Sequence, residues 1–473
     1  MKWENVISAK YTETGVQRFN GNPFIEAMPS LATTKAAFLT GLSHYPPKPT
    51  AKTRKANEIV RLMELSTLND VVFPFPEYQK AALAMATIMR DAYVSRNPLT
   101  VIDRQRRHAL ALNGADGLPF PENWKSSAKG HFIMAVSGMG KTTFANAFLL
   151  RYPPVISHDG YNGQHLKCHQ IVYMVLRVPH DATLKSLCMQ FFENVDSLLQ
   201  TNYVRQARSL RNIAPMVQLM GQVATAVSLG LLVIDELQNL RNARGGDAHF
   251  VLNLFSEIIE RLGISLLAIA TPAVQPVFEG SVRNARKIAS YGETVLKPMK
   301  KNDQVWRDFC ETYWDYSFVK KKEPLRDDVM DAWHKVSAGN TAFAALAFML
   351  AQRNEIGGRE VVDEIAFLRT AATDMAFLQP AISALNSRNP NKLRAFDDLL
   401  WSPQYTALRK AMGAVEPAHD RKGRDNPILD EFDDMSNELP KATRRRNGTH
   451  ATLKKADDIF DGTLPSEDPL ARQ

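Results

Sequence analysis

A glycine-containing segment near residue 140 is the part of the sequence best suited to chemistry. It reads Ala135-Val136-Ser137-Gly138-Met139-Gly140-Lys141-Thr142, follows an apolar run and precedes a predicted helix over 141–150. Glycines at such a turn let backbone N–H groups point inward, and a helix N-terminus behind them attracts anions. Ala135 stands where the pattern G-x-x-x-x-G-K-[ST] has its first glycine, but the two glycines nearest a bound phosphate remain. We therefore predict a phosphate-binding loop formed by Ser137, Gly138, Met139, Gly140, Lys141, Thr142 and Thr143.

Two carboxylates end another apolar run, Leu231-Leu232-Val233-Ile234-Asp235-Glu236. In a parallel sheet this strand can lie next to the strand that enters the phosphate loop. Asp235 would then reach Mg²⁺, and Glu236 would reach the water in line with the γ-phosphate. A pair of acidic residues at a strand end usually lies on the solvated surface. Its occurrence together with a phosphate-binding loop instead favours a role in nucleotide hydrolysis. We predict an ATPase that uses ATP and Mg²⁺, with Thr142 and Asp235 as metal ligands and with Lys141 and Glu236 as catalytic residues.

Two further catalytic candidates lie downstream. Thr271 follows the apolar run 264–270 and is placed to sense the γ-phosphate. A Thr-Pro helix start with a capping hydroxyl is an equal alternative, and it does not exclude sensing. Arg283 and Arg286 have helical spacing, and an arginine here can extend into a neighbouring subunit's nucleotide and stabilise transition-state charge. Arg286 is our candidate for that role, with Arg283 as the alternative residue and a solvated helix face as the alternative interpretation.

The elements that must position these residues alternate between strands and helices. Four short apolar runs, over 131–136, 170–178, 231–234 and 264–270, are separated by long helical stretches. Buried parallel strands joined by crossover helices give this pattern, so we predict an α/β core with a parallel sheet. A small helical domain after such a core suits the lid of an AAA+ P-loop NTPase.

The same patterns divide the chain into parts. An amphipathic helix is predicted over 78–94, and helices alone are predicted after residue 303. Residues 425–439 hold six acidic residues and no basic ones, which suits either a docking segment or plain disorder. The expected parts are an N-terminal extension for partner or DNA contacts (1–115), the ATPase core (116–302), the helical lid (303–395) and a flexible tail (396–473).

Composition sets broader limits. Lys and Arg outnumber Asp and Glu by 58 to 50, an excess that permits binding to a polyanion without requiring it. Cys168, Cys188 and Cys310 lack metal-ligand spacing, so we expect reduced structural thiols. The sequence shows neither a signal-peptide core nor an apolar run long enough to cross a bilayer, so we expect a cytoplasmic protein without membrane contact.

Two longer segments are more selective than the phosphate loop. Residues 231–240 read Leu-Leu-Val-Ile-Asp-Glu-Leu-Gln-Asn-Leu, and residues 21–29 read Gly-Asn-Pro-Phe-Ile-Glu-Ala-Met-Pro. They resemble the D-E-x-Q-N-L and N-P-[LF]-I-E-A-[LM]-P segments of TnsC/TniB-type AAA+ regulators of heteromeric, TnsABC-like transposons, including CRISPR-associated ones. The resemblance covers about residues 11–320, with further similarities at 96–98, 191–196, 201–203, 285–287 and 306–314. Residues 339–342, Gly-Asn-Thr-Ala, depart from AAA+ relatives that carry an arginine near such a Gly-Asn.

The resemblance implies a DNA-binding protein that oligomerises as a ring or filament on target duplex DNA. It would link a target-selection protein of the TniQ/TnsD type to transposase subunits, with ATP hydrolysis controlling assembly. The tail shows no pattern of this family, and its charge and apolar spacing alone predict a docking segment, for which a transposase subunit is the expected partner. Three basic clusters could bind DNA phosphates without sequence preference, or could be solvated faces: 104–107, 297–301 and 320–322.

Two other classes of function remain as alternatives. A P-loop kinase or signalling NTPase would share the phosphate loop, but a kinase also needs a substrate base and lid arginines that the sequence does not show. An AAA+ replication loader or remodeller should carry a winged-helix domain after the lid, and the acidic-then-basic tail does not resemble one.

Overall fold

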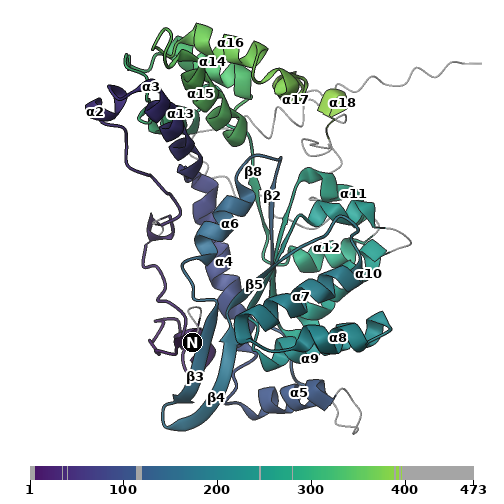
Figure 1. Cartoon of the computed structure of the whole chain (residues 1–473). Coiled ribbons are helices and arrows are strands. Elements are labelled where there is room, and N and C mark those ends of the chain that lie inside the picture. Colours follow the sequence, from purple (N-terminus) through teal and green to yellow (C-terminus); the bar gives the residue numbers. More distant parts are fainter. Residues whose placement is uncertain are drawn as a thin grey trace, which may run out of the picture. The chain divides into compact units, whose positions relative to one another are not determined.

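A five-stranded parallel sheet forms the centre of the computed structural model (Figure 1). The structure describes residues 6–34, 36–39, 41–112, 120–243, 247–279, 281–387, 390–393 and 396. The chain divides into two units, Met1–His419 and Asp420–Gln473. The predicted tail lies, apart from Phe396, outside the described residues.

The sheet order is β5-β6-β7-β2-β8, and every neighbouring pair is parallel. Its strands are β2 (Gly130–Ala135), β5 (Tyr173–Arg177), β6 (Leu231–Asp235), β7 (Ser265–Ala270) and β8 (Glu293–Leu296). Parallel pairing puts the carboxyl ends of all these strands at one edge, where ligands bind in folds of this kind. The predicted α/β core is confirmed, but β7 lies between β6 and β2. The expectation that the Asp235 strand lies next to the phosphate-loop strand is therefore wrong.

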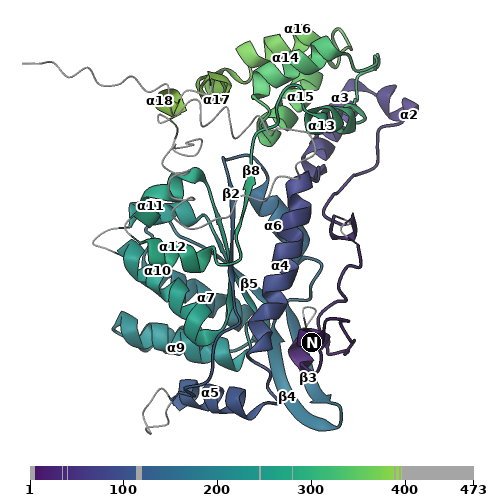
Figure 2. The same cartoon turned by 180° about the vertical axis from the view of Figure 1, so that it is seen from behind.

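Helices cover both faces of this sheet. Helices α4 and α6 lie on one face, and α7, α9, α10 and α12 lie on the other (Figure 1, Figure 2). Successive strand residues point to opposite faces, so Ile133 and Ile269 join the core beside α4, whereas Phe132 and Ala268 join the core beside α7. The helices of this region are α4 (Pro76–Val94), α5 (Val101–Leu112), α6 (Lys141–Leu149), α7 (Leu184–Leu199), α8 (Tyr203–Ser209), α9 (Ile213–Ala226), α10 (Asp247–Glu257), α11 (Gln275–Glu279) and α12 (Val282–Ile288).

A second, three-stranded sheet was not predicted. Strands β3 (Val155–Tyr161) and β4 (Gln164–Ile171) form an antiparallel hairpin, and β1 (Val6–Ser8) pairs with β3. The hairpin turns at Asn162 and Gly163, with φ angles of 49° and 77°, as a two-residue turn that matches strand twist requires. The strand predicted over 170–178 is present as β5, but it starts only at Tyr173, because Gln170 and Ile171 end β4.

The N-terminal segment packs against its own chain. Helix α1 (Pro23–Glu26) holds the fully buried side chains of Phe24 and Ile25, and Asn22 Nδ2 donates to the carbonyl of Tyr93 on α4 at 2.6 Å. The helix predicted over 78–94 is α4, which carries Pro76 at its first position; it is buried on all sides over residues 88–93 and so is less amphipathic than predicted. Helix α5 was not predicted.

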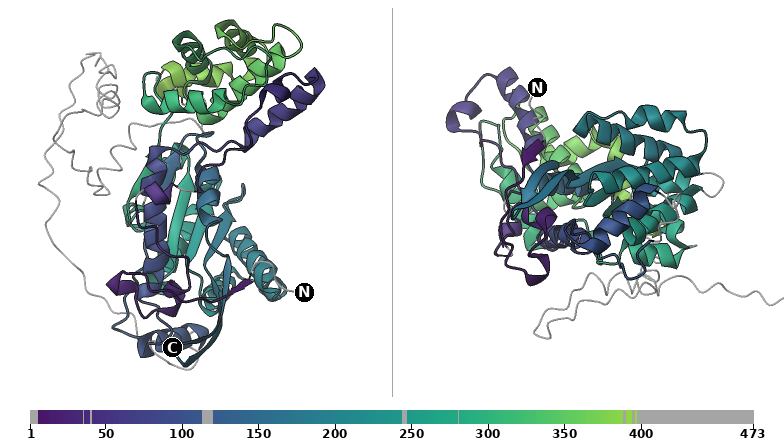
Figure 3. Two further views of the ribbon diagram at one scale, coloured as in Figure 1. Left: turned by 90° about the vertical axis from the view of Figure 1, so that its left-hand side faces the viewer. Right: turned by 90° about the horizontal axis from the view of Figure 1, so that it is seen from below.

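The lid consists of helices only, as predicted: α13 (Gln304–Trp314), α14 (Asp327–Ser337), α15 (Thr341–Glu355), α16 (Glu364–Ala372), α17 (Gln379–Ser387) and α18 (Pro390–Leu393). The short helices α2 (Ala51–Arg54) and α3 (Glu58–Glu64) lie beside the lid (Figure 3). Arg61 on α3 is fully buried, and its two terminal nitrogens each donate a hydrogen bond to the carboxylate of Glu360, at 2.6 and 2.7 Å. This bidentate pair ties the N-terminal segment to the lid.

Two further sequence expectations concern the cysteines and membrane-spanning helices. All three cysteines are free. None of the helices in the described part combines the length and the apolar character that crossing a bilayer requires.

Candidate nucleotide-binding site

The phosphate loop joins the end of β2 to the start of α6. Gly138 and Gly140 have φ angles of 83° and 76°, in the left-handed region where only glycine is unstrained. A Cβ at Gly138 would also lie 2.6 Å from Asn340 Oδ1. Both glycines predicted from the sequence are thus required by backbone geometry, and the loop leads directly into the N-terminus of α6 at Lys141.

The side chains of the phosphate loop differ in their contacts and their exposure to solvent. Lys141 Nζ donates to the carbonyls of Ala135 and Val136, at 3.0 and 3.3 Å, so its ammonium lies against the loop. Met139 is buried, whereas Ser137 and Thr143 are exposed. Met139 therefore anchors the loop by its side chain, and only its backbone is left for a phosphate.

Thr142 on α6 meets Asp235 at the end of β6, although β6 and the strand that leads into the phosphate loop, β2, are not neighbours in the sheet. Thr142 Oγ1 donates to Asp235 Oδ2 at 2.8 Å. Asp235 is 2% exposed, and its Oδ1 accepts from the backbone N–H of Glu236 at 2.8 Å. A hydroxyl and a carboxylate at the mouth of a phosphate loop are hard oxygen ligands that suit Mg²⁺. The donor set fits the predicted metal site.

The side chain of Glu236 makes a contact separate from those of Asp235. Its φ angle of 57° places it in the left-handed region, which a residue with a side chain rarely adopts. Its Oε2 accepts from Gln238 Nε2, and Gln238 Oε1 accepts from the Thr271 N–H at 3.1 Å. The carboxylate of Asp235 thus contacts Thr142, whereas the carboxylate of Glu236 is linked through Gln238 to Thr271 at the end of β7.

Thr271 lies at that end of β7 and is 3% exposed. It precedes the short 3-10 helix η6 (Pro272–Val274), but its hydroxyl makes no capping bond. Among the described residues, Thr271 Oγ1 is buried without a hydrogen-bond partner. A buried hydroxyl left unpaired costs about 1–3 kcal/mol, so an acceptor from a ligand or water would be favourable there.

Helix α12 carries the two candidate arginines. Arg283 and Arg286 are both exposed, and neither side chain makes an ion pair with any residue that the structure describes. Asn284 fixes the helix by hydrogen bonds to Ser256 and Asn253, at 2.7 and 3.1 Å. The structure does not bring Arg286 into contact with the phosphate loop of its own chain.

A comparison with family models identifies the core. A model described as AAA domain matches residues 125–278, the stretch that holds the phosphate loop, Asp235 and Thr271. This stretch of the chain is therefore similar to AAA domains. With its parallel sheet and its helical lid, the structure has the AAA+ P-loop fold. No curated protein sequence matches the chain.

The solved structures similar to this chain include three proteins at low sequence identity. A Walker-type ATPase of Pyrococcus abyssi is 12% identical, with 71% of this chain and 89% of that chain covered and a TM-score of 0.34. The ORC2 protein of Aeropyrum pernix, in ADPNP–ADP complexes, is 14% identical, with 72% and 94% covered and a TM-score of 0.35. The RuvB Holliday junction branch migration motor of Thermotoga maritima is 12% identical, with 67% and 81% covered and a TM-score of 0.30.

Two residues that support the AAA+ phosphate loop were not predicted. Tyr78 on α4 donates its hydroxyl to the carbonyls of Met139 and Gly140, each at 3.3 Å, and its ring stacks on Phe144 at 4.2 Å. Burial raises the pKa of Tyr78, so the hydroxyl stays a donor. The sequence marks Tyr78 only as a member of an apolar helix face.

The second unpredicted residue is Asn340, at the N-terminus of lid helix α15. Its Nδ2 donates to the carbonyl of Ser137 at 2.7 Å, and the N–H of Ala342 donates to the carbonyl of Gly138 at 3.0 Å. The lid thus contacts the phosphate loop directly through the segment that lacks the arginine. The Gly-Asn pair was the only sequence signal for this contact.

The basic cluster over 104–107 is not a continuous surface. Arg106 is 1% exposed, and it pairs with Asp103 at 2.8 Å on α5. Arg107 pairs with the other oxygen of Asp103 at 2.6 Å, while Arg104 is exposed. The prediction that Arg106 contacts DNA phosphates is wrong, because the side chain is buried. Ion pairs also involve lysines of the other two clusters: Lys301–Asp331, Lys320–Glu360 and Lys322–Asp315.

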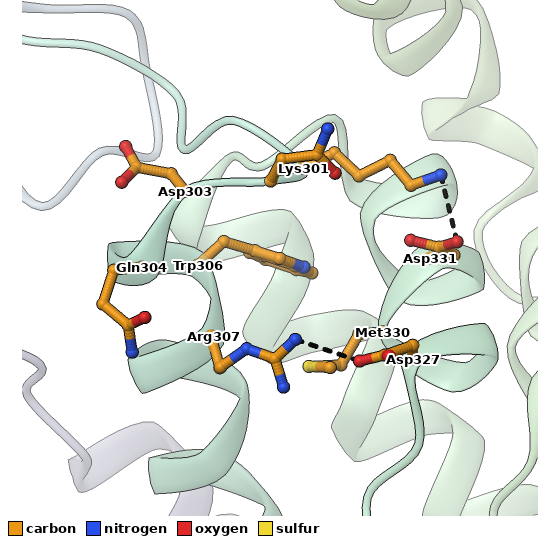
Figure 4. Close-up of a pocket in the computed structure, with 9 residues that line it drawn as sticks. Lys301, Asp303, Gln304, Trp306, Arg307, Asp327, Met330 and Asp331 are labelled. Atoms are coloured by element: carbon orange, nitrogen blue, oxygen red, sulfur yellow. Dashed lines mark hydrogen bonds and ion pairs between the residues drawn. The ribbon is translucent and has the colours of Figure 1, made fainter. Parts of the chain in front are cut away.

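A separate pocket of about 320 Å³ lies in the lid, between the start of α13 and α14 (Figure 4). Two ion pairs flank it, Lys301–Asp331 and Arg307–Asp327, each at 3.0 Å. Trp306 lies between these pairs and is 1% exposed. Together with Tyr313, Trp314, Tyr316 and Phe318 it belongs to the buried core of the lid, as expected for aromatic residues here.

Proposed function

We propose that this chain is an ATP-hydrolysing regulator of DNA transposition. It would oligomerise on target duplex DNA and link a target-selection protein to transposase subunits. The observation that carries the hydrolytic part is the hydrogen bond between Thr142 and Asp235, which brings two oxygen ligands together at the mouth of a phosphate loop. The transposition part rests on the resemblance of residues 21–29 and 231–240 to TnsC/TniB regulators.

The chain's own groups have distinct tasks in hydrolysis. Bound Mg²⁺ neutralises charge on the phosphate oxygens. Thr142 and Asp235 would hold the metal, and Lys141, which contacts the loop carbonyls here, would bind the terminal phosphates. Glu236 accepts the proton of the attacking water, and the unpaired hydroxyl of Thr271 donates to the γ-phosphate or to that water.

The two selective motifs have structural roles in this fold, which supports the resemblance. In the segment 231–240, Gln238 links Glu236 to Thr271, and Asn239 Nδ2 donates to the carbonyl of Val178 at 2.8 Å. In the segment 21–29, Glu26 accepts from the hydroxyl of Tyr161 on the β3–β4 hairpin at 2.7 Å. Both motifs therefore join separate elements around the ATPase core.

Assembly on DNA places the exposed arginines between subunits. Arg286, with Arg283 as the alternative, would reach the nucleotide of the neighbouring subunit and stabilise transition-state charge. Exposed basic residues such as Arg104 and Lys321 would contact phosphates, so binding should weaken with salt and show little sequence preference.

The Glu236→Gln variant tests the proposal. It should bind ATP with wild-type affinity, hydrolyse it at least about a hundredfold more slowly, and form complexes on duplex DNA that outlive those of the wild type. A variant that hydrolyses ATP at the wild-type rate would remove Glu236 from catalysis. ATP hydrolysis without any binding to duplex DNA would favour a signalling NTPase. Assembly on DNA without recruitment of a transposase would favour a replication loader.

A further inference from the structure

Gln238 occupies a special position between two catalytic candidates. It lies on the 3-10 helix η4 (Leu237–Asn242), two residues after Glu236. Its amide nitrogen donates to Glu236 Oε2, and its amide oxygen accepts from the backbone N–H of Thr271 at 3.1 Å. One side chain thus connects the end of β6 to the end of β7.

An amide is the side-chain group suited to this connection. Glu236 presents an acceptor and the Thr271 N–H presents a donor, so the linking group must donate at one end and accept at the other. Glutamate in place of Gln238 could accept from Thr271 but could not donate to an ionised Glu236. Leucine could do neither.

The backbone of Glu236 gives a second reason to expect a functional constraint. A non-glycine residue at a φ of 57° is strained, and such strain persists only where surrounding contacts hold it. The contacts here are the Glu236 N–H to Asp235 Oδ1 at 2.8 Å and the Asn239 N–H to the Glu236 carbonyl at 2.9 Å. Both contacts hold the backbone of Glu236, and Gln238 holds its side chain.

We propose that Gln238 is a positioning residue that fixes the carboxylate of Glu236 relative to the end of β7. This inference rests on the proposed role of Glu236 as the base. Gln238 holds Oε2, which leaves Oε1 as the oxygen that takes the proton from water. Because Gln238 also holds the Thr271 N–H, the base and the γ-phosphate sensor keep one fixed spacing while nucleotide enters and leaves.

Three variants of the full chain separate the two halves of the connection. Gln238→Leu removes both hydrogen bonds, and Gln238→Glu keeps the shape and the acceptor for Thr271 but removes the donor to Glu236. Asn239→Leu is the matched control, because it removes an amide on the same turn that donates only to Val178. Steady-state ATP hydrolysis gives kcat and KM, and ATP titration of each variant gives Kd.

The proposal predicts a loss in kcat without a loss in nucleotide affinity. The loss of a hydrogen bond to a charged group corresponds to a fall in kcat on the order of tenfold to a hundredfold. Gln238→Glu and Gln238→Leu should both show that fall, with Kd for ATP changed less than about threefold, while Asn239→Leu keeps the wild-type kcat. Equal losses in Gln238→Leu and Asn239→Leu would reduce Gln238 to a structural residue and overturn the proposal.

A double substitution distinguishes failure of this inference from failure of the proposed function. In a Glu236→Gln background, Gln238→Leu should reduce kcat by less than about twofold, because Gln238 acts through Glu236. Losses that multiply would contradict the inference and leave the base assignment intact. Wild-type hydrolysis by Glu236→Gln alone would instead refute the base assignment itself.

Discussion

Replacing Asn340 by alanine should loosen the lid from the phosphate loop. Asn340 is fully buried, and its Nδ2 donates to the carbonyl of Ser137 at 2.7 Å. Its Oδ1 accepts from the N–H groups of Ala342 and Phe343, which caps helix α15. The substitution therefore removes a helix cap and a contact between lid and loop at once.

The magnitude follows from these two losses. Removal of an N-cap costs about 1 kcal/mol, and an ordinary hydrogen bond, such as the part-buried one to the Ser137 carbonyl, contributes about 0.5–1.5 kcal/mol. Asn340→Ala should therefore lower the opening free energy of α15 by about 1.5–2.5 kcal/mol. Asn340→Ser keeps a capping hydroxyl and removes only the bond to Ser137, so it should lose about 0.5–1.5 kcal/mol.

Native-state hydrogen exchange of the Ala342 and Phe343 amides measures this opening directly. The ATP dissociation constant, measured in parallel, should rise in both variants, because the loop loses the contact that holds the Ser137 carbonyl. Protection of α15 within about 0.5 kcal/mol of the wild type in Asn340→Ala would refute the reasoning, since scatter of that size is ordinary for surface substitutions.

Other predictions test separate parts of the account. Lys141→Ala should abolish ATP-dependent assembly on DNA, because the lysine neutralises the terminal phosphates; assembly at unchanged ATP concentration, followed by DNA pelleting, would exclude this role. Arg61→Met removes the bidentate partner of the Glu360 carboxylate and leaves it the longer ion pair to Lys320 at 3.6 Å, so it should lower the free energy of unfolding by about 3 kcal/mol at pH 7. Hydrogen bonding to Arg61 lowers the pKa of Glu360 from 4.5 to about 2, so the wild type keeps this contribution above about pH 4.5 and loses it as pH falls toward 2; acid unfolding of wild type and variant should therefore converge there. Arg286→Ala should lower ATP turnover only in assembled protein, and mixing with Lys141→Ala should partly restore it; an equal loss in isolated monomers would make the arginine structural. Deletion after Pro403 should spare ATP hydrolysis and assembly and remove transposase binding in a pull-down; lost assembly with binding intact would place the segment in the ATPase fold.

Much of the core could be predicted because its signals are local. Glycines with left-handed φ angles and an apolar strand leave a direct trace in sequence, so Gly138, Gly140 and β6 were found. The meeting of Thr142 with Asp235 was also expected, although strand order was not. Strand order depends on pairing between distant segments, and periodicity along one strand does not encode it.

The unpredicted parts depend on tertiary contacts. Gln238 and Asn340 have their roles because β7 and α15 lie where they do. Arg106 seemed to belong to a basic cluster, but the packing of α5 buries it beside Asp103. The β3–β4 hairpin has a mixed polar sequence, and its turn at Asn162 was the only strong local signal for it.

Electron microscopy of the purified protein with duplex DNA is the most direct test of the central claim. One sample would contain a non-hydrolysable ATP analogue and the other ADP, with Lys141→Ala as the control that lacks the phosphate contact. We predict rings or filaments around the DNA with the analogue, and none with ADP or with the variant. Assemblies that are the same with both nucleotides, or no assembly on DNA with either, would contradict an ATP-controlled regulator that acts on duplex DNA.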